Sequence, residues 1–136
     1  MKNRINVYLL NRTTKGIELS DYSHINEDLF SGRSDIVKVV LPEGVKSIGN
    51  NAFENCVNLE EVELPDTLEN IGSEAFVNCI NLKKIQYGKK VDVDKTAFAG
   101  CKSLVLAQFY LRWDNMRKLW SASLITDYGL YIKESE

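Results

Sequence analysis

The amino-acid sequence predicts an α/β repeat fold, a solenoid of short coils that stack on one another. The first observation is a row of phenylalanines: Phe30, Phe53 and Phe76 are 23 residues apart, and Phe98 follows after 22. The second is that five other residue types recur at the same step, namely Ile25/Ile48/Ile71, Pro42/Pro65, Gly49/Gly72, Ala52/Ala75 and Cys56/Cys79. A fixed period of roughly 20–50 residues is typical of solenoids, because each repeat buries its apolar side chains only against its neighbours.

Composition limits the classes of function. The chain has 136 residues, 44% of them hydrophobic, which is enough for one folded domain and excludes a disordered chain. Its net charge is −2 with both signs interspersed, so we expect no nucleic-acid partner. No stretch approaches the roughly 20 apolar residues of a membrane span, so we expect no membrane insertion. As written, the chain is expected to be cytoplasmic, or secreted or surface-exposed if a leader was removed.

We expect three parts within one structural domain. Residues 1–35 form an N-terminal cap with a degenerate repeat, in which Ile5, Val7 and Leu9 alternate with other side chains as in a strand. Residues 36–106 hold the regular repeats. Residues 107–136 form a C-terminal cap, with an amphipathic helix over 110–121 followed by a strand or hairpin over 124–132.

Each repeat begins with a strand pattern, at 36–42, 59–65 and 82–87. Alternation directs Val39, Val62 and Ile85 inward and their neighbours outward, and proline ends the first two strands because it lacks an amide donor. The strands are expected to form a parallel sheet on the concave face of the solenoid. The second half of each repeat is expected to hold a short extended piece and one helical turn, which buries residues such as Phe53.

The pattern L-P-x-x-L-x-x-I-G-x-x-A-F-x-x-C-x-x-L, from Leu64 to Leu82, resembles the leucine-rich repeats of the bacterial surface protein type called BspA-like. The resemblance covers residues 36–104 strongly and about fifteen more weakly. It implies a parallel-sheet solenoid with a role in protein binding or adhesion.

The three cysteines Cys56, Cys79 and Cys101 hold one position of the repeat. A disulfide framework expects an even number and zinc expects close CxxC-like pairs, and neither is present. We interpret them as small core residues, with a redox or metal role as the alternative. We expect no cofactor.

Two segments suggest chemistry. Asp92-Val93-Asp94-Lys95-Thr96 resembles the D-x-D-x-T nucleophile loop of haloacid-dehalogenase-type phosphatases, but Val93 holds the inward position of the repeat, which favours a variant loop. His24, the single histidine, follows Ser20 and Asp21, but proximity in one loop does not give the geometry of general-base catalysis. We expect no catalytic residue.

Outward strand positions are the candidate binding residues. Stacking in register places Glu60 and Glu61 beside Lys83 and Lys84, with Lys38 on the other side of Glu61, so the charges either neutralise one another or form a recognition surface. The candidates on the concave face are Val37, Lys38, Val40, Glu60, Glu61, Glu63, Lys83, Lys84, Gln86, Val105 and Leu106. The C-terminal candidates, which either close the stack or dock a partner, are the aromatic residues Tyr110, Trp113, Trp120 and Tyr128.

These features favour a non-catalytic module that binds a protein partner through the concave sheet. The alternative is a self-associating structural or adhesion unit, which makes a homo-oligomer possible. A more remote alternative is a Mg²⁺-dependent phosphatase at Asp92 and Asp94.

Overall fold

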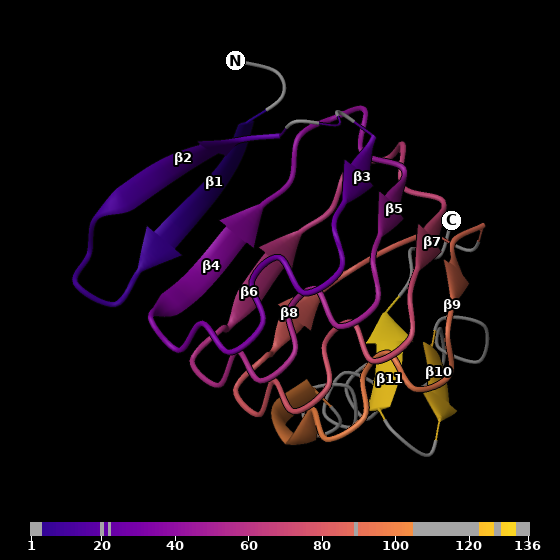
Figure 1. The fold of residues 1–136 in the computed structure, drawn as a ribbon. Helices are drawn as coiled ribbons and strands as arrows, with labels where there is room; N and C mark the ends of the chain where they lie inside the picture. Colours follow the sequence, from indigo (N-terminus) through magenta and orange to yellow (C-terminus); the bar gives the residue numbers. More distant parts are fainter. Residues whose placement is uncertain are drawn as a thin grey trace.

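A computed structural model describes residues 4–19, 21, 23–88, 90–104, 123–126 and 129–132. Successive repeats lie side by side, and each contributes one strand to each of two sheets, with a turn region that carries the phenylalanine between them (Figure 1). We call one such repeat a coil. The described part of the chain is therefore a repeat fold, as the 23-residue period predicts.

The first sheet contains the strands that the repeat pattern predicts, β4 (Ile36–Val40), β6 (Glu61–Glu63) and β8 (Lys84–Ile85). They run parallel, and residues one repeat apart are paired in register. Glu61 therefore lies between Lys38 and Lys84. The second sheet is also parallel and contains β3 (His24–Ile25), β5 (Ser47–Ile48), β7 (Asn70–Ile71) and β9 (Asp92–Val93). Its strands are two residues long, because only that part of each coil is extended.

The N-terminal strand is confirmed, but the prediction of a purely parallel first sheet is wrong. β1 (Arg4–Leu9) forms a hairpin with β2 (Thr14–Glu18), and β1 pairs antiparallel with β4. The first sheet is thus mixed, in the order β2-β1-β4-β6-β8 (Figure 1). Alternation of Ile5 and Val7 specifies which side of the strand is buried, and it leaves the direction of the strand open.

The helical turn expected in each coil is replaced by tight turns that bond to the next coil. Every second amide crosses between coils: Asn51 donates to the Ser73 carbonyl at 3.0 Å and Phe53 to the Ala75 carbonyl at 2.7 Å. The intervening amides close turns within their own coil, as Ala52 does. A helix would direct all of them to its own carbonyls. Asn51 instead takes a left-handed φ of 61°, which turns the alternate amides outward.

The phenylalanines form a continuous stack through the core. Phe30, Phe53, Phe76 and Phe98 have successive centroid distances of 5.2, 4.9 and 5.3 Å, and all four are buried. The period of 23 residues therefore places one ring directly on the next. The single 22-residue step is absorbed before β9, where Val93 still pairs with Ile71.

The cysteines lie beside this stack as predicted. Cys56, Cys79 and Cys101 are free and at most 1% exposed, and each thiol donates to the carbonyl of a phenylalanine in the preceding coil at 3.1–3.2 Å. The adjoining Cys101 and Cys56 thiols, together with burial, raise the pKa of Cys79. The three thiols are thus part of the core, and Cys79 at the centre of the row is held in its neutral form.

The C-terminal part is described only in pieces. A helical turn spans 102–104. The hairpin expected over 124–132 is confirmed as β10 (Ser123–Thr126) paired antiparallel with β11 (Gly129–Ile132). The predicted amphipathic helix over 110–121 lies outside the described residues.

Candidate functional site

The candidate site is the solvent-facing side of the mixed sheet, which we call the outer sheet face. It is formed by the residues that alternate with the buried Val39, Val62 and Ile85, together with the half-buried or exposed residues two positions before each of these, Val37, Glu60 and Lys83. Its members are Arg4, Asn6 and Tyr8 beside or on β1, Val37, Lys38 and Val40 on β4, Glu60, Glu61 and Glu63 on or next to β6, and Lys83, Lys84 and Gln86 on or next to β8. Nine of the residues predicted from the sequence lie on this face.

The other predicted site residues lie outside the described part of the chain. They are Val105, Leu106, Tyr110, Trp113, Trp120 and Tyr128.

Lys38 is the centre of the charged groups on the outer sheet face. Its Nζ lies 3.0 Å from Glu63 Oε2 and 3.8 Å from Glu61 Oε1. It also lies 5.4 Å from the centroid of the Tyr8 ring. The hydrogen bond to Glu63 and the charges of both carboxylates raise the pKa of Lys38, so the ammonium is charged at neutral pH. One lysine thus holds side chains of three neighbouring strands together.

The lysines on or next to β8, Lys83 and Lys84, differ from Lys38 in their ion pairs. Lys84 is in register with Glu61, and the sequence predicts that Glu60 and Glu61 pair with Lys83 and Lys84. Among the described residues neither lysine has an ion pair within 4.0 Å, and both are exposed. The face therefore carries an acidic β6 next to a basic β8 whose lysines are exposed.

A groove of about 1380 Å³ continues from this face around the second and third coils. It is lined by Lys46, by the stretch from Glu61 to Glu69, by the stretch from Lys83 to Gly88, and by Lys90 and Val91. Its walls are the loops that join β6 to β7 and β8 to β9. The site is thus a charged face with an adjoining hollow, open along two coils.

Sequence reasoning missed the contribution of β1. Tyr8 is 38% exposed and pairs across the ladder with Lys38, and Asn6 pairs with Val40. The period-2 pattern of residues 4–9 indicated a strand, but only the tertiary structure shows that this strand extends the same face. The available sequence signal was Asn6, a polar residue between the apolar Ile5 and Val7, which indicates that one side of this strand faces solvent.

In the first of the two segments with possible chemistry, the side chain of Asp94 takes part in a turn. Asp94 Oδ1 accepts hydrogen bonds from the Thr96 amide at 2.9 Å and hydroxyl at 2.7 Å, and these bonds lower the pKa of Asp94. The carboxylate is therefore occupied in shaping its turn. Asp92 is an exposed residue of β9, at the end of the second sheet rather than at the end of a buried parallel strand.

His24 lies beside Ser47 rather than in a triad. Its Nδ1 forms a hydrogen bond with the Ser47 hydroxyl of the next coil, and the two residues pair in the β3–β5 ladder. Asp21, the acid nearest in sequence, instead accepts from the Ser23 amide and hydroxyl at 3.0 Å. The contact therefore joins two coils of the second sheet.

Within the described ranges, no group of three or more His, Cys, Asp or Glu side chains is placed to hold a metal ion. The same part of the chain contains no helix long and apolar enough to cross a membrane.

Comparison with known proteins agrees with the repeat geometry. A family model described as a BspA type leucine rich repeat region, in six copies, matches residues 13–118, which is more than half of the chain. No curated protein and no solved structure matches the sequence. The matched span contains all the phenylalanines of the stack and all three cysteines, which recur there at a step of 22 or 23 residues. The chain therefore belongs to the BspA-type leucine-rich repeat family.

Proposed function

We propose that this chain is a non-catalytic protein-binding module, a short solenoid that holds a protein partner on its outer sheet face. Its family is one of protein-interaction and adhesion-type repeats. In this proposal the repeats at 36–106 supply most of the face, and residues 1–35 and 107–136 close the two ends of the stack.

The observation that carries the proposal is the group formed by Lys38, Tyr8 and the β6 carboxylates. Tyr8 is exposed and Val40 is half-buried, so a partner can cover apolar surface next to a charged centre. Tyrosine is enriched among residues that dominate binding energy, and surrounding charges set partner choice and orientation.

Backbone ladders on both sides of each coil also favour this function. β4, β6 and β8 are linked in register, and the turns bond from coil to coil. A face that is already ordered loses little conformational entropy when it binds, so more of the contact energy appears as affinity.

The proposal is tested by comparing two double variants as baits in a lysate of the source cells. The first, Lys38→Glu/Val40→Glu, alters the outer sheet face, and we expect it to lose the specific protein that the wild type retains. The matched control, Ile80→Glu/Lys102→Glu, makes the same types of change at two exposed turn positions and should keep that protein. Circular dichroism first establishes that both variants are folded. Retention of the same proteins by all three baits would contradict the proposal.

A further inference from the structure

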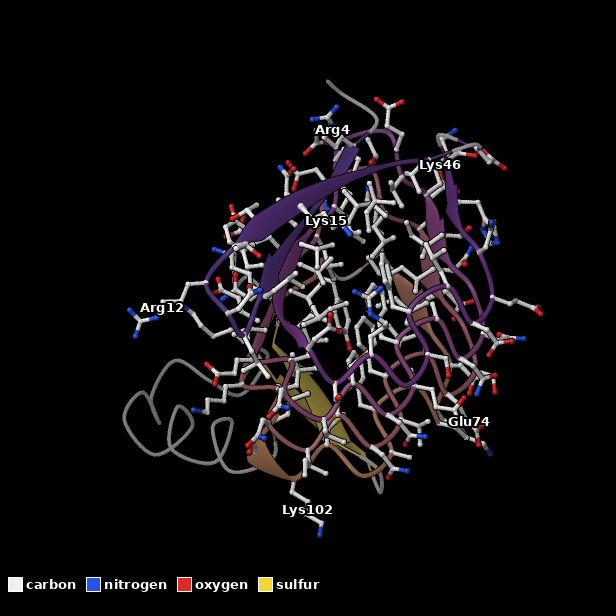
Figure 2. The ribbon with its side chains drawn as sticks, turned by 60° about the vertical axis from the view of Figure 1, so that its left-hand side comes forward. Arg4, Arg12, Lys15, Lys46, Glu74 and Lys102 are labelled. Carbon is white, nitrogen blue, oxygen red and sulfur yellow. The ribbon has the colours of Figure 1, made fainter. Side chains whose placement is uncertain are left out.

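The distribution of charge on the outer sheet face is self-complementary. β6 and the residue before it carry three carboxylates, Glu60, Glu61 and Glu63, and Lys38 contacts the last two. Three negative charges and one positive charge leave this half of the face at −2, and the charge of Arg4 on β1 (Figure 2) is balanced by its ion pair with Glu18 on β2. The β8 half carries Lys83 and Lys84, two ammonium groups without an ion pair among the described residues, for a charge of +2. The two halves are equal in magnitude and opposite in sign.

Because β6 and β8 are in register, a two-fold rotation can bring the opposite charges of two copies together. Glu61 and Lys84 are Cα partners in the β6–β8 ladder, so they lie at the same height along the strands, and Glu60 and Lys83 lie one residue earlier. A two-fold rotation about an axis parallel to the strands, midway between β6 and β8, keeps these heights and exchanges the two strands. It therefore places β6 of one copy over β8 of the other, with Glu60 opposite Lys83 and Glu61 opposite Lys84.

Other positions of the axis are disfavoured by like charges. An axis along β6 places Glu61 over its own symmetry mate, and an axis along β8 does the same for Lys84. Sheets pack face to face at about 10 Å, a gap that a lysine and a glutamate side chain can span together. An isologous contact of this kind closes with two copies.

We infer that the partner of the outer sheet face is a second copy of this chain, docked face to face by the acidic β6 of each copy against the basic β8 of the other. The inference rests on the proposed function, because it names the occupant of the same face. Exposed ion pairs are weak and screened by salt, so the dimer is weak and sensitive to ionic strength. Its strength comes from four pairs formed together, two for each copy.

Charge reversal gives a test with an internal rescue, read as the mass in solution by sedimentation at rising concentration. Lys83→Glu/Lys84→Glu and Glu60→Lys/Glu61→Lys each place like charges across the contact, so each variant alone is expected to be monomeric. An equimolar mixture restores all four pairs and is expected to form a heterodimer, which also shows that both variants are folded. For the wild type, raising the salt from about 50 to about 500 mM should weaken dimerisation about tenfold or more.

A matched control separates this contact from general attraction between oppositely charged proteins. Glu27→Lys/Glu43→Lys makes the same change of charge at two exposed residues away from the outer sheet face. Its outer sheet face is intact, so it should dimerise with itself as the wild type does. Mixed with Lys83→Glu/Lys84→Glu, it should form no heterodimer, and the Lys83→Glu/Lys84→Glu variant should remain monomeric. A heterodimer in this control mixture would overturn the inference.

The remaining outcomes are also decisive. A wild type that is monomeric at about 0.5 mM, where even a weak millimolar association is detectable, would overturn the inference. A wild-type dimer that both charge-reversed variants keep would overturn it as well, because the contact would lie elsewhere. The proposed function is judged separately: it stands if a lysate protein is lost with Lys38→Glu/Val40→Glu, and it fails together with the inference if neither experiment finds binding at this face.

Discussion

Replacing Phe76 with alanine removes the central ring of the phenylalanine stack. The side chain is 0% exposed, and the rings of Phe53 and Phe98 lie on its two sides with centroids 4.9 and 5.3 Å away. Both neighbours are held by their own coils, whose backbones are tied to one another by hydrogen bonds, so the gap cannot close freely. We therefore expect the full cost of a large core truncation, about 3–5 kcal/mol of unfolding free energy.

A second substitution separates the free energy contributed by ring stacking from that contributed by apolar burial. Phe76→Leu keeps most of the apolar volume and loses two stacked pairs, each of which contributes about 0.5–1.5 kcal/mol beyond burial, so it should cost about 1–3 kcal/mol. The measurement is urea unfolding followed by circular dichroism, with the slope of free energy against urea compared among the variants. Tyr8→Ala is the control on the surface, where the ring is 38% exposed, and it should cost at most about 1 kcal/mol. A loss below about 1 kcal/mol for Phe76→Ala would refute the central place of the ring in the stack.

Three further changes test the packing between coils. Gly49→Ala would bring its new Cβ within 2.7 Å of the Ile25 carbonyl oxygen and 2.8 Å of the Glu27 amide, so it should cost about 1–3 kcal/mol. At Gly88 a new Cβ meets no atom of the described residues within 4 Å, so Gly88→Ala should be nearly neutral by the same urea assay. Glu74 has a left-handed φ of 55°, which asparagine tolerates better, so Glu74→Asn should raise the unfolding free energy by about 0.5–1 kcal/mol, and no gain in melting temperature would contradict this. The three thiols, represented by the buried Cys79, should react with a thiol reagent only after the protein is unfolded in urea, and prompt reaction of the native protein would mean that they are not in the core.

The parts of the site that could be predicted are those that repeat. Lys38, Glu61 and Lys84 were assigned to one row because they are 23 residues apart, and the β4–β6–β8 register confirms that row. Which of these residues form ion pairs could not be predicted from the spacing. Lys38 reaches both Glu61 and Glu63, and no ion pair joins Glu61 to Lys84, because side-chain direction is decided by the local surroundings and not by the period.

The turn region shows a second limit of sequence reasoning. The apolar spacing of Ala52, Phe53 and Cys56 is compatible with a helical turn, and it is equally compatible with the turns that the structure contains. The amides of Asn51, Phe53 and Asn55 bond to the next coil, and this option exists only once two coils are stacked. Local propensity could not reveal it.

The sequence by itself determined the repeat fold, the phase of its core residues and the family. A fixed step forces identical residues onto one another, as in the stack of phenylalanines, and this follows from spacing alone. The tertiary structure alone decided that β1 joins β4 antiparallel, that Tyr8 lies beside Lys38, and that Lys83 and Lys84 form no ion pair with Glu60 or Glu61. The physical reason is that a repeat period specifies which residues are equivalent, whereas strand direction, cap placement and charge pairing depend on contacts between residues that no period relates.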